Sequence, residues 1–71
     1  MINQPIVKEH VTPEDIKAFK ETMIAEYRKI PWPKEIIDRE IELIQQRPDS
    51  LYIHLIQAGT DPVYMVDLET M

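Results

Sequence analysis

The residues with the greatest capacity for chemistry are the only serine, two histidines and a scatter of carboxylates. A hydrolytic triad would need Ser50, His54 and an acid such as Asp67. The segment that contains Ser50 and His54 reads as extended, and four residues of extended chain separate two side chains by more than hydrogen-bond reach. We therefore expect no nucleophilic triad, and we place Ser50 in a turn with Asp49.

His54, Tyr52 and Asp67 offer a second arrangement, an acid/base group on one face of a sheet. A cross-strand pair and its diagonal neighbour lie within side-chain range of each other. Tyrosine and histidine are also common on partly covered faces and at interfaces, where they do no chemistry. We therefore expect His54 and Tyr52 to belong to a surface rather than to an active site, and we predict that the protein is not an enzyme.

Metal, nucleotide and thiol sites lack their usual residue patterns. Neither His10 nor His54 has a second histidine at helical spacing, and Glu9 and Glu14 form no acidic loop. The single glycine, Gly59, cannot build a Gly-rich phosphate loop, and the absence of cysteine excludes disulfides and thiolate zinc sites. We expect no cofactor and no metal.

Composition indicates one folded domain that spans residues 1–71. Of these residues 44% are hydrophobic, and the charged residues are mixed in sign, which is typical of a folded chain rather than a disordered one. The net charge of −5 argues against direct binding to nucleic-acid phosphates. Neither a long apolar run nor a signal-peptide pattern is present, so we expect a cytoplasmic protein that does not bind membranes.

Two amphipathic helices are predicted in the first two thirds of the chain. Thr12 can cap the first helix, and Pro13 suits its first position. Apolar residues then recur at spacings of three and four, which predicts a helix to about Lys29. A second helix with the same periodicity begins at Pro33 and ends before Pro48.

Beyond the helices, segments 51–57 and 63–69 are rich in β-branched and aromatic residues and flank a turn that contains Gly59. This pattern predicts a C-terminal β-hairpin. Segment 2–11 alternates loosely and would supply a third strand. We therefore expect an α+β fold with two helices packed on a small antiparallel sheet, in the order strand (optional), helix, helix, strand, strand.

This order of elements, with the capping run Thr12, Pro13, Glu14 and Asp15 after an N-terminal strand, resembles the N-terminal part of the GCN5-related acetyltransferases. The resemblance covers nearly the whole chain. In that family a later strand and a Gly-rich loop hold acetyl-CoA, and this sequence ends before either. The resemblance thus implies no acetyltransferase activity here.

The predicted hairpin leaves one sheet face that two helices do not cover. A small domain benefits strongly from covering such a face, and aromatic residues and methionine are enriched at interface cores. A partner protein, a second copy of the chain or the N-terminal strand would cover this face equally well. With Trp32 at the joint between the helices, the candidate partner-binding residues are Trp32, Tyr52, His54, Ile56, Val63 and Met65.

These observations favour a small acidic, non-enzymatic protein-binding module or homodimer. It would act as an inhibitor, an antitoxin-like protein or an adaptor by occupying a partner's surface. One alternative is a nucleic-acid mimic that blocks a DNA-binding protein with helical carboxylates, namely Glu14, Glu21, Glu35, Asp38 and Glu42. The other is a minor enzymatic or small-molecule-binding role around His54, for which so small a core leaves little room.

Overall fold

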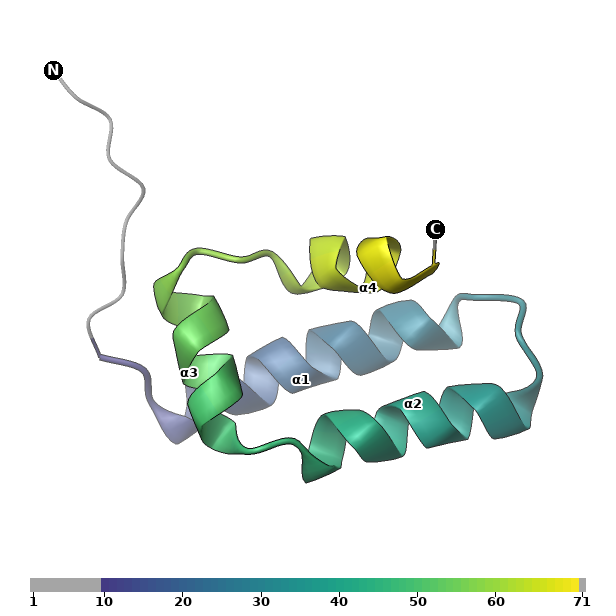
Figure 1. The fold of residues 1–71 in the computed structure, drawn as a ribbon, viewed down its shortest axis with the longest axis horizontal. Coiled ribbons are helices and arrows are strands. Elements are labelled where there is room, and N and C mark those ends of the chain that lie inside the picture. Colours follow the sequence, from purple (N-terminus) through teal and green to yellow (C-terminus); the bar gives the residue numbers. More distant parts are fainter. Residues whose placement is uncertain (1–9, 71) are drawn as a thin grey trace, which may run out of the picture.

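The computed structural model describes residues 10–70, which form four helices and no strand (Figure 1). The helices are α1 (Pro13–Arg28), α2 (Lys34–Gln46), α3 (Asp49–Gln57) and α4 (Pro62–Thr70). The predicted α+β class is therefore wrong, while the two predicted N-terminal helices are confirmed as α1 and α2. Most of the proposed strand over 2–11 lies outside the described residues.

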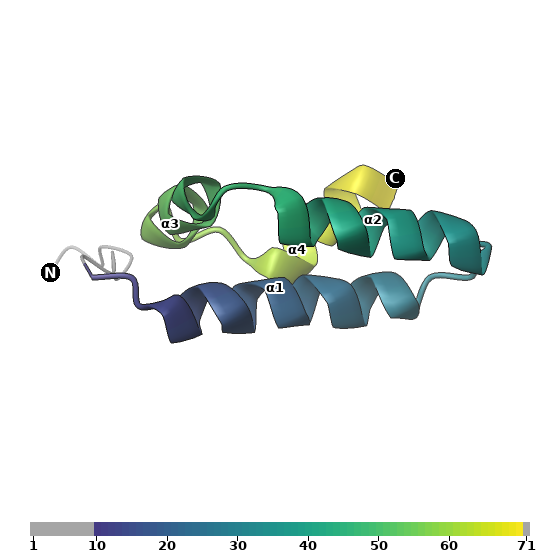
Figure 2. The same cartoon turned by 90° about the horizontal axis from the view of Figure 1, so that it is seen from below.

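Helix α1 is the centre of the arrangement. It contacts each of the other three helices, and all three lie on the same side of it (Figure 2). Helix α2 runs antiparallel to α1 along one flank, α4 runs parallel to α1 along the other, and α3 lies across the N-terminal end of α1 (Figure 1). One face of α1 therefore carries the core, and the opposite face is left to solvent.

A proline stands at the start of every helix in the described part of the chain. Pro13 and Pro62 are the first residues of α1 and α4, and Pro33 and Pro48 are the N-caps of α2 and α3. Proline suits these positions because the first amides of a helix have no helical acceptor and because its φ is already near the helical value. Pro48 and Pro62 therefore mark the starts of helices as well as breaks between elements.

Helix α1 begins with a complete capping box. The Thr12 hydroxyl accepts a hydrogen bond from the Asp15 amide at 3.2 Å, and the Thr12 amide donates to the Asp15 carboxylate at 2.9 Å. The two bonds provide acceptors for two backbone amides that have no acceptor within the helix and would otherwise bond to water. The cap predicted at Thr12 is confirmed.

We expect Thr12→Ala to lower the free energy of unfolding by about 1 kcal/mol, because the substitution removes the acceptor of the Asp15 amide. Urea denaturation followed by circular dichroism measures the loss. Thr22→Ala is the matched control, since the Thr22 hydroxyl only donates to the Ala18 carbonyl within the same helix at 2.9 Å. Equal losses in the two variants would contradict the capping role.

Residues 51–57, predicted as the first strand of a hairpin, form most of α3, and the predicted hairpin tip is the end of this helix. Gly59 has a φ of +74°, and its amide donates to the Ile56 carbonyl at 3.0 Å. The Thr60 amide donates to the Leu55 carbonyl at 3.0 Å. These two bonds define a Schellman motif, in which glycine at positive φ closes a helix. Glycine at positive φ is equally suited to a hairpin turn, so Gly59 alone does not distinguish the two structures.

The second predicted strand, 63–69, lies within α4. Asp61 caps this helix, because its carboxylate accepts a hydrogen bond from the Val63 amide at 2.9 Å. The element order on which the resemblance to the acetyltransferases rests is therefore absent from residues 10–70.

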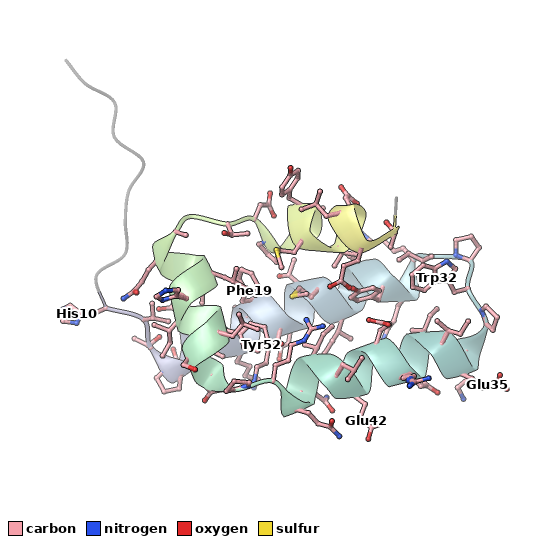
Figure 3. All side chains as sticks on the ribbon, viewed as in Figure 1. His10, Phe19, Trp32, Glu35, Glu42 and Tyr52 are labelled. Atoms are coloured by element: carbon pink, nitrogen blue, oxygen red, sulfur yellow. The ribbon has the colours of Figure 1, made fainter. Side chains whose placement is uncertain are left out.

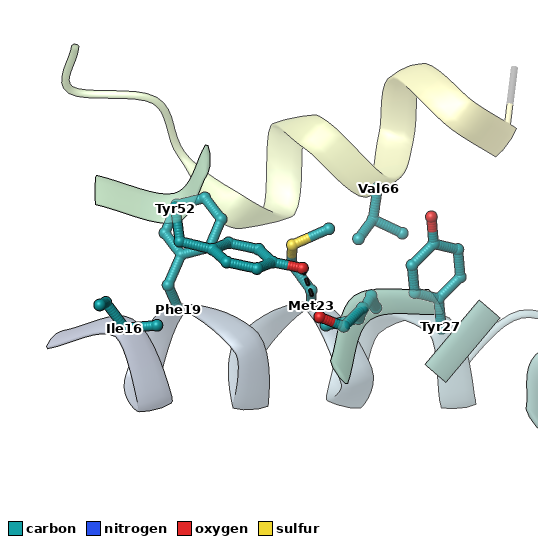
Figure 4. Close-up of a cluster of buried hydrophobic side chains, with 7 residues drawn as sticks. Ile16, Phe19, Met23, Tyr27, Tyr52 and Val66 are labelled. Carbon is teal, nitrogen blue, oxygen red and sulfur yellow. Dashed lines mark hydrogen bonds between the residues drawn. The ribbon is translucent and has the colours of Figure 1, made fainter. Parts of the chain in front are cut away.

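The core lies between the inner face of α1 and the three helices packed on it (Figure 4). Met23 and Tyr52 are 0% exposed, and the ring of Tyr52 lies 5.9 Å from that of Phe19, centroid to centroid. All four helices contribute to one cluster of buried side chains, which consists of Ile16, Phe19, Met23, Tyr27, Ile44, Tyr52 and Val66.

One buried hydrogen bond joins the end of α2 to α3. The Ile44 carbonyl has no helical donor four residues later, because Pro48 lacks an amide hydrogen. The Tyr52 hydroxyl donates to this carbonyl at 2.6 Å. The side chain thus supplies the donor that the backbone cannot, and it ties α3 to the end of α2.

Candidate protein-interaction surface

The six residues predicted to bind a partner do not share one face. Tyr52 is part of the core, and Trp32 lies at the corner between α1 and α2, toward the opposite end of the molecule (Figure 3). His54 is exposed on α3. The remaining three are half-buried, namely Ile56, Val63 and Met65. The grouping depended on the predicted sheet, and the helices separate these residues.

Helix α3 brings Ser50 and His54 closer than an extended chain would, because residues four apart share a helix face. Both are exposed, and they line a shallow pocket of about 350 Å³ with Leu51. Within residues 10–70 no hydrogen bond joins the two side chains. Asp67 lies on α4, whose backbone does not closely approach α3 in the described structure. The structure therefore does not bring the three members of a triad together.

Tyr52 and Asp67 do not join His54 in an acid/base group either. The Tyr52 hydroxyl is buried and bonded to the Ile44 carbonyl.

Among residues 10–70, no group of three metal-ligating side chains is placed to hold an ion. His10 is exposed, and Glu9 lies outside the described residues. No described helix is both long and apolar enough to cross a bilayer.

Charge is distributed unevenly along the chain. Residues 1–47 hold all eight Lys and Arg with nine Asp and Glu, whereas residues 48–71 hold four acids and no Lys or Arg. The last third thus carries −4 of the total charge of −5. Asp49 pairs with Lys20 at 3.2 Å, and Glu69 lies 3.9 Å from Arg47. The other two acids, Asp61 and Asp67, have no cationic partner in the part of the chain that the structure describes.

Helix α4 presents two large apolar side chains beside these carboxylates. Tyr64 is 58% exposed and Leu68 is 48% exposed, and their spacing of four places them on one side of the helix, away from buried Val66. Asp61 precedes Tyr64 by one turn, and Asp67 is adjacent to Leu68 in sequence. We call Asp61, Tyr64, Asp67 and Leu68 the α4 face.

A second pair of exposed apolar residues lies on α2 but has a different electrostatic setting. Ile36 and Leu43 are two turns apart and exposed. Between them on the same side of α2 lie Arg39 and Glu40, whose charges are opposite in sign. The α4 face therefore differs from the α2 pair in carrying charge of a single sign.

No known protein family matches this chain. No curated protein and no solved structure matches it either. Function must therefore be argued from the surface itself. The uneven charge distribution is visible in the sequence, and it is the signal that could have located this surface before the structure.

Helix α4 is held on the core by one apolar and one polar anchor. Val66 is buried against α1, and at the C-terminal end of α4 the hydroxyl of Tyr27 donates a hydrogen bond to the Glu69 carboxylate. Tyr27 is 1% exposed. Burial, followed by the hydrogen bond and charge of Glu69, raises the pKa of the Tyr27 phenol well above its usual value of 10. The anchor therefore fixes the position from which the α4 face is presented.

The raised pKa of Tyr27 predicts a loss of stability in alkali. In the unfolded chain the phenol ionises near pH 10, while the folded state retains the proton. The free energy of unfolding therefore has its full value below about pH 10 and decreases above it, by up to about 1.4 kcal/mol per pH unit for one such group. Tyr52, whose pKa is also raised by burial, adds to the same trend.

Urea unfolding between about pH 8 and pH 11.5 measures this dependence. We expect Tyr27→Phe to flatten the fall above pH 10, because phenylalanine has no proton to lose. Tyr64→Phe removes an exposed phenol and is the control that should leave the slope unchanged. If Tyr27→Phe leaves the fall in the free energy of unfolding above pH 10 unchanged, Tyr27 is not the group that causes it.

Proposed function

We propose that this protein is a non-enzymatic binding module whose α4 face docks on a basic, partly apolar surface of another protein. The observation that carries the proposal is the pairing of two exposed apolar side chains with two carboxylates that have no cationic partner in residues 10–70. Tyrosine is enriched among residues that contribute most to binding at protein interfaces. Unpaired carboxylates around it attract a partner of opposite charge and increase the association rate.

The chemistry of the α4 face favours a basic protein over other occupants. Carboxylates repel nucleic-acid phosphates and anionic lipid headgroups. A second copy bound through the same face would set Asp61 and Asp67 against like charges, which is unfavourable at an interface. A basic helix or loop with an apolar side chain would instead neutralise both aspartates and cover Tyr64 and Leu68.

Within this proposal the protein acts by occupying its partner's surface, as an inhibitor, an antitoxin-like protein or an adaptor would. The competing idea of a nucleic-acid mimic has less support. Its carboxylates are divided between α1 and α2, and Glu21 lies 3.9 Å from Lys17. Arg39 also stands directly after Asp38 on α2.

The test compares three forms of the protein as bait in a native extract. These are the wild type, a Tyr64→Ala/Leu68→Ala variant of the α4 face, and an Ile36→Ala/Leu43→Ala variant of the α2 pair. The two variants each remove one pair of exposed apolar side chains, so they are matched in kind. We expect a partner that the wild type and the α2 variant retain equally and that the α4 variant loses.

The purified partner is then titrated by calorimetry. We expect the α4 variant to bind at least about tenfold more weakly, since two anchor truncations of about 1 kcal/mol or more each are typical of interface centres. Asp61→Asn/Asp67→Asn should slow association and reduce its salt dependence. A partner lost by the α2 variant and kept by the α4 variant would move the interface to α2. Retention by both variants would overturn the proposal.

A further inference from the structure

A second, independent feature lies at the corner between α1 and α2. The corner contains a pocket of about 360 Å³. Its apolar side is formed by the half-buried side chains of Ile30, Trp32 and Ile37, and its polar rim by the exposed side chains of Arg28, Lys34 and Asp38. We propose that this pocket binds a small organic carboxylate with a flat apolar body.

The apolar wall is held in place before any ligand binds. Trp32 stands between Pro31 and Pro33, whose rings restrict the backbone on both sides. Its amide donates to the Ile30 carbonyl at 2.8 Å, and its ring lies 6.3 Å from that of Tyr27, centroid to centroid. A preformed wall lowers the ordering cost of binding, and a flat ring surface suits a flat partner.

The cations around this pocket are available for a ligand. Four Lys and Arg residues of the described chain pair with carboxylates, namely Lys17, Lys20, Lys29 and Arg47. Arg28, Lys34 and Arg39 have no ion pair within residues 10–70, and two of these three line the pocket. On a protein of net charge −5, the pocket is thus a local site for an anion.

The pocket also limits the charge of its ligand. Asp38 lies on the same rim as Arg28 and Lys34 and repels an anion. Two cations and one carboxylate give the rim a net charge of +1, which a single carboxylate neutralises and a doubly charged phosphate exceeds. The chemistry thus favours a monocarboxylate whose body stacks on Trp32, and the proposal uses no residue of the α4 face.

The test uses the indole N–H of Trp32, which is the only tryptophan in the chain and gives a single resolved signal in a ¹⁵N-edited NMR spectrum. The probe is 3-phenylpropionate, and its neutral matched compound is 3-phenylpropionamide. We expect 3-phenylpropionate to shift the indole signal in a saturable way. We expect the affinity of the amide to be lower by a factor of at least about two to five, as for loss of an exposed ion pair.

Variants then separate the roles of the charges. Arg28→Gln and Lys34→Gln should each weaken binding of 3-phenylpropionate by about two- to fivefold, and Asp38→Asn should strengthen it. Arg39→Gln removes an unpaired cation that does not line the pocket and should leave binding unchanged. Equal binding of carboxylate and amide, an unmoved indole signal, or equal losses in Arg39→Gln and Arg28→Gln would each overturn the proposal.

The same carboxylate chemistry occurs in free aromatic acids and at the C-terminus of a peptide that ends in phenylalanine. Titration with acetyl-Ala-Ala-Phe, with a free or an amidated C-terminus, distinguishes the two sources. Tighter binding of the free-ended peptide than of 3-phenylpropionate supports a chain terminus as the ligand. The reverse order supports a free acid. If both peptides bind and the amidated one binds as well as the free-ended one, the carboxylate is not recognised and the proposal fails.

Discussion

Met23→Ala should lower the free energy of unfolding by about 2 to 5 kcal/mol, as truncation of a fully buried methionine typically does. Met23 is 0% exposed and lies on the inner face of α1, which all three other helices contact. A cavity there cannot be filled by movement of a single helix. A chain this small has a total stability near the low end of about 5 to 15 kcal/mol, so the variant should lose much of its helical circular-dichroism signal at 37 °C.

Two further variants keep this expectation testable even if Met23→Ala does not fold. Met23→Leu nearly conserves volume and should cost less than about 1.5 kcal/mol. Met65→Ala shortens a half-buried methionine of α4 and should cost distinctly less than Met23→Ala. If Met65→Ala is the more damaging substitution, the core is centred on α4 rather than on α1.

Tyr52→Phe should lower the free energy of unfolding by about 1 to 3 kcal/mol although it removes a single oxygen atom. The Tyr52 hydroxyl donates to the Ile44 carbonyl at 2.6 Å, and Pro48 leaves that carbonyl without a helical donor. The variant therefore leaves a backbone acceptor unsatisfied beside the core. Equilibrium urea denaturation gives the loss directly.

The control for this substitution is Tyr64→Phe, which removes a hydroxyl from a side chain that is 58% exposed. That change should alter stability by no more than about 0.5 kcal/mol, as is usual at exposed positions. A loss of less than about 0.5 kcal/mol for Tyr52→Phe would contradict the role of its hydroxyl as the donor to the Ile44 carbonyl.

Local signals were enough to predict α1 and α2. Thr12 and Pro13 mark the start of α1, and apolar residues recur along 16 and 13 residues of the two helices. These segments are long enough for a period of 3.6 to be distinguished from a period of two. Pro48 then ends the second helix. The corner at Trp32 was also predicted correctly, because prolines on both sides of it prevent a continuous helix.

The same local signals led to a wrong prediction for α3 and α4. Each of these helices has only nine residues, and β-branched and aromatic residues favour strands when propensity alone is considered. Isolated helices of this length are marginal in water, so their helical state depends on packing. Burial of Tyr52 and Val66 against α1 supplies that packing. One clue was present, because the prolines at residues 48 and 62 suit the starts of helices.

For the candidate surface, too, the sequence determined some features and the tertiary structure determined others. The sequence alone determined the acidic character of the last third of the chain, since no Lys or Arg follows Arg47. It also placed Gly59 in a turn, but it did not determine whether that turn joins two strands or ends a helix. Tertiary structure decided which side chains are exposed. Side chains alternate along a strand and recur every three or four residues on a helix, so the change of element buried Tyr52 and exposed Tyr64 with Leu68 on one face.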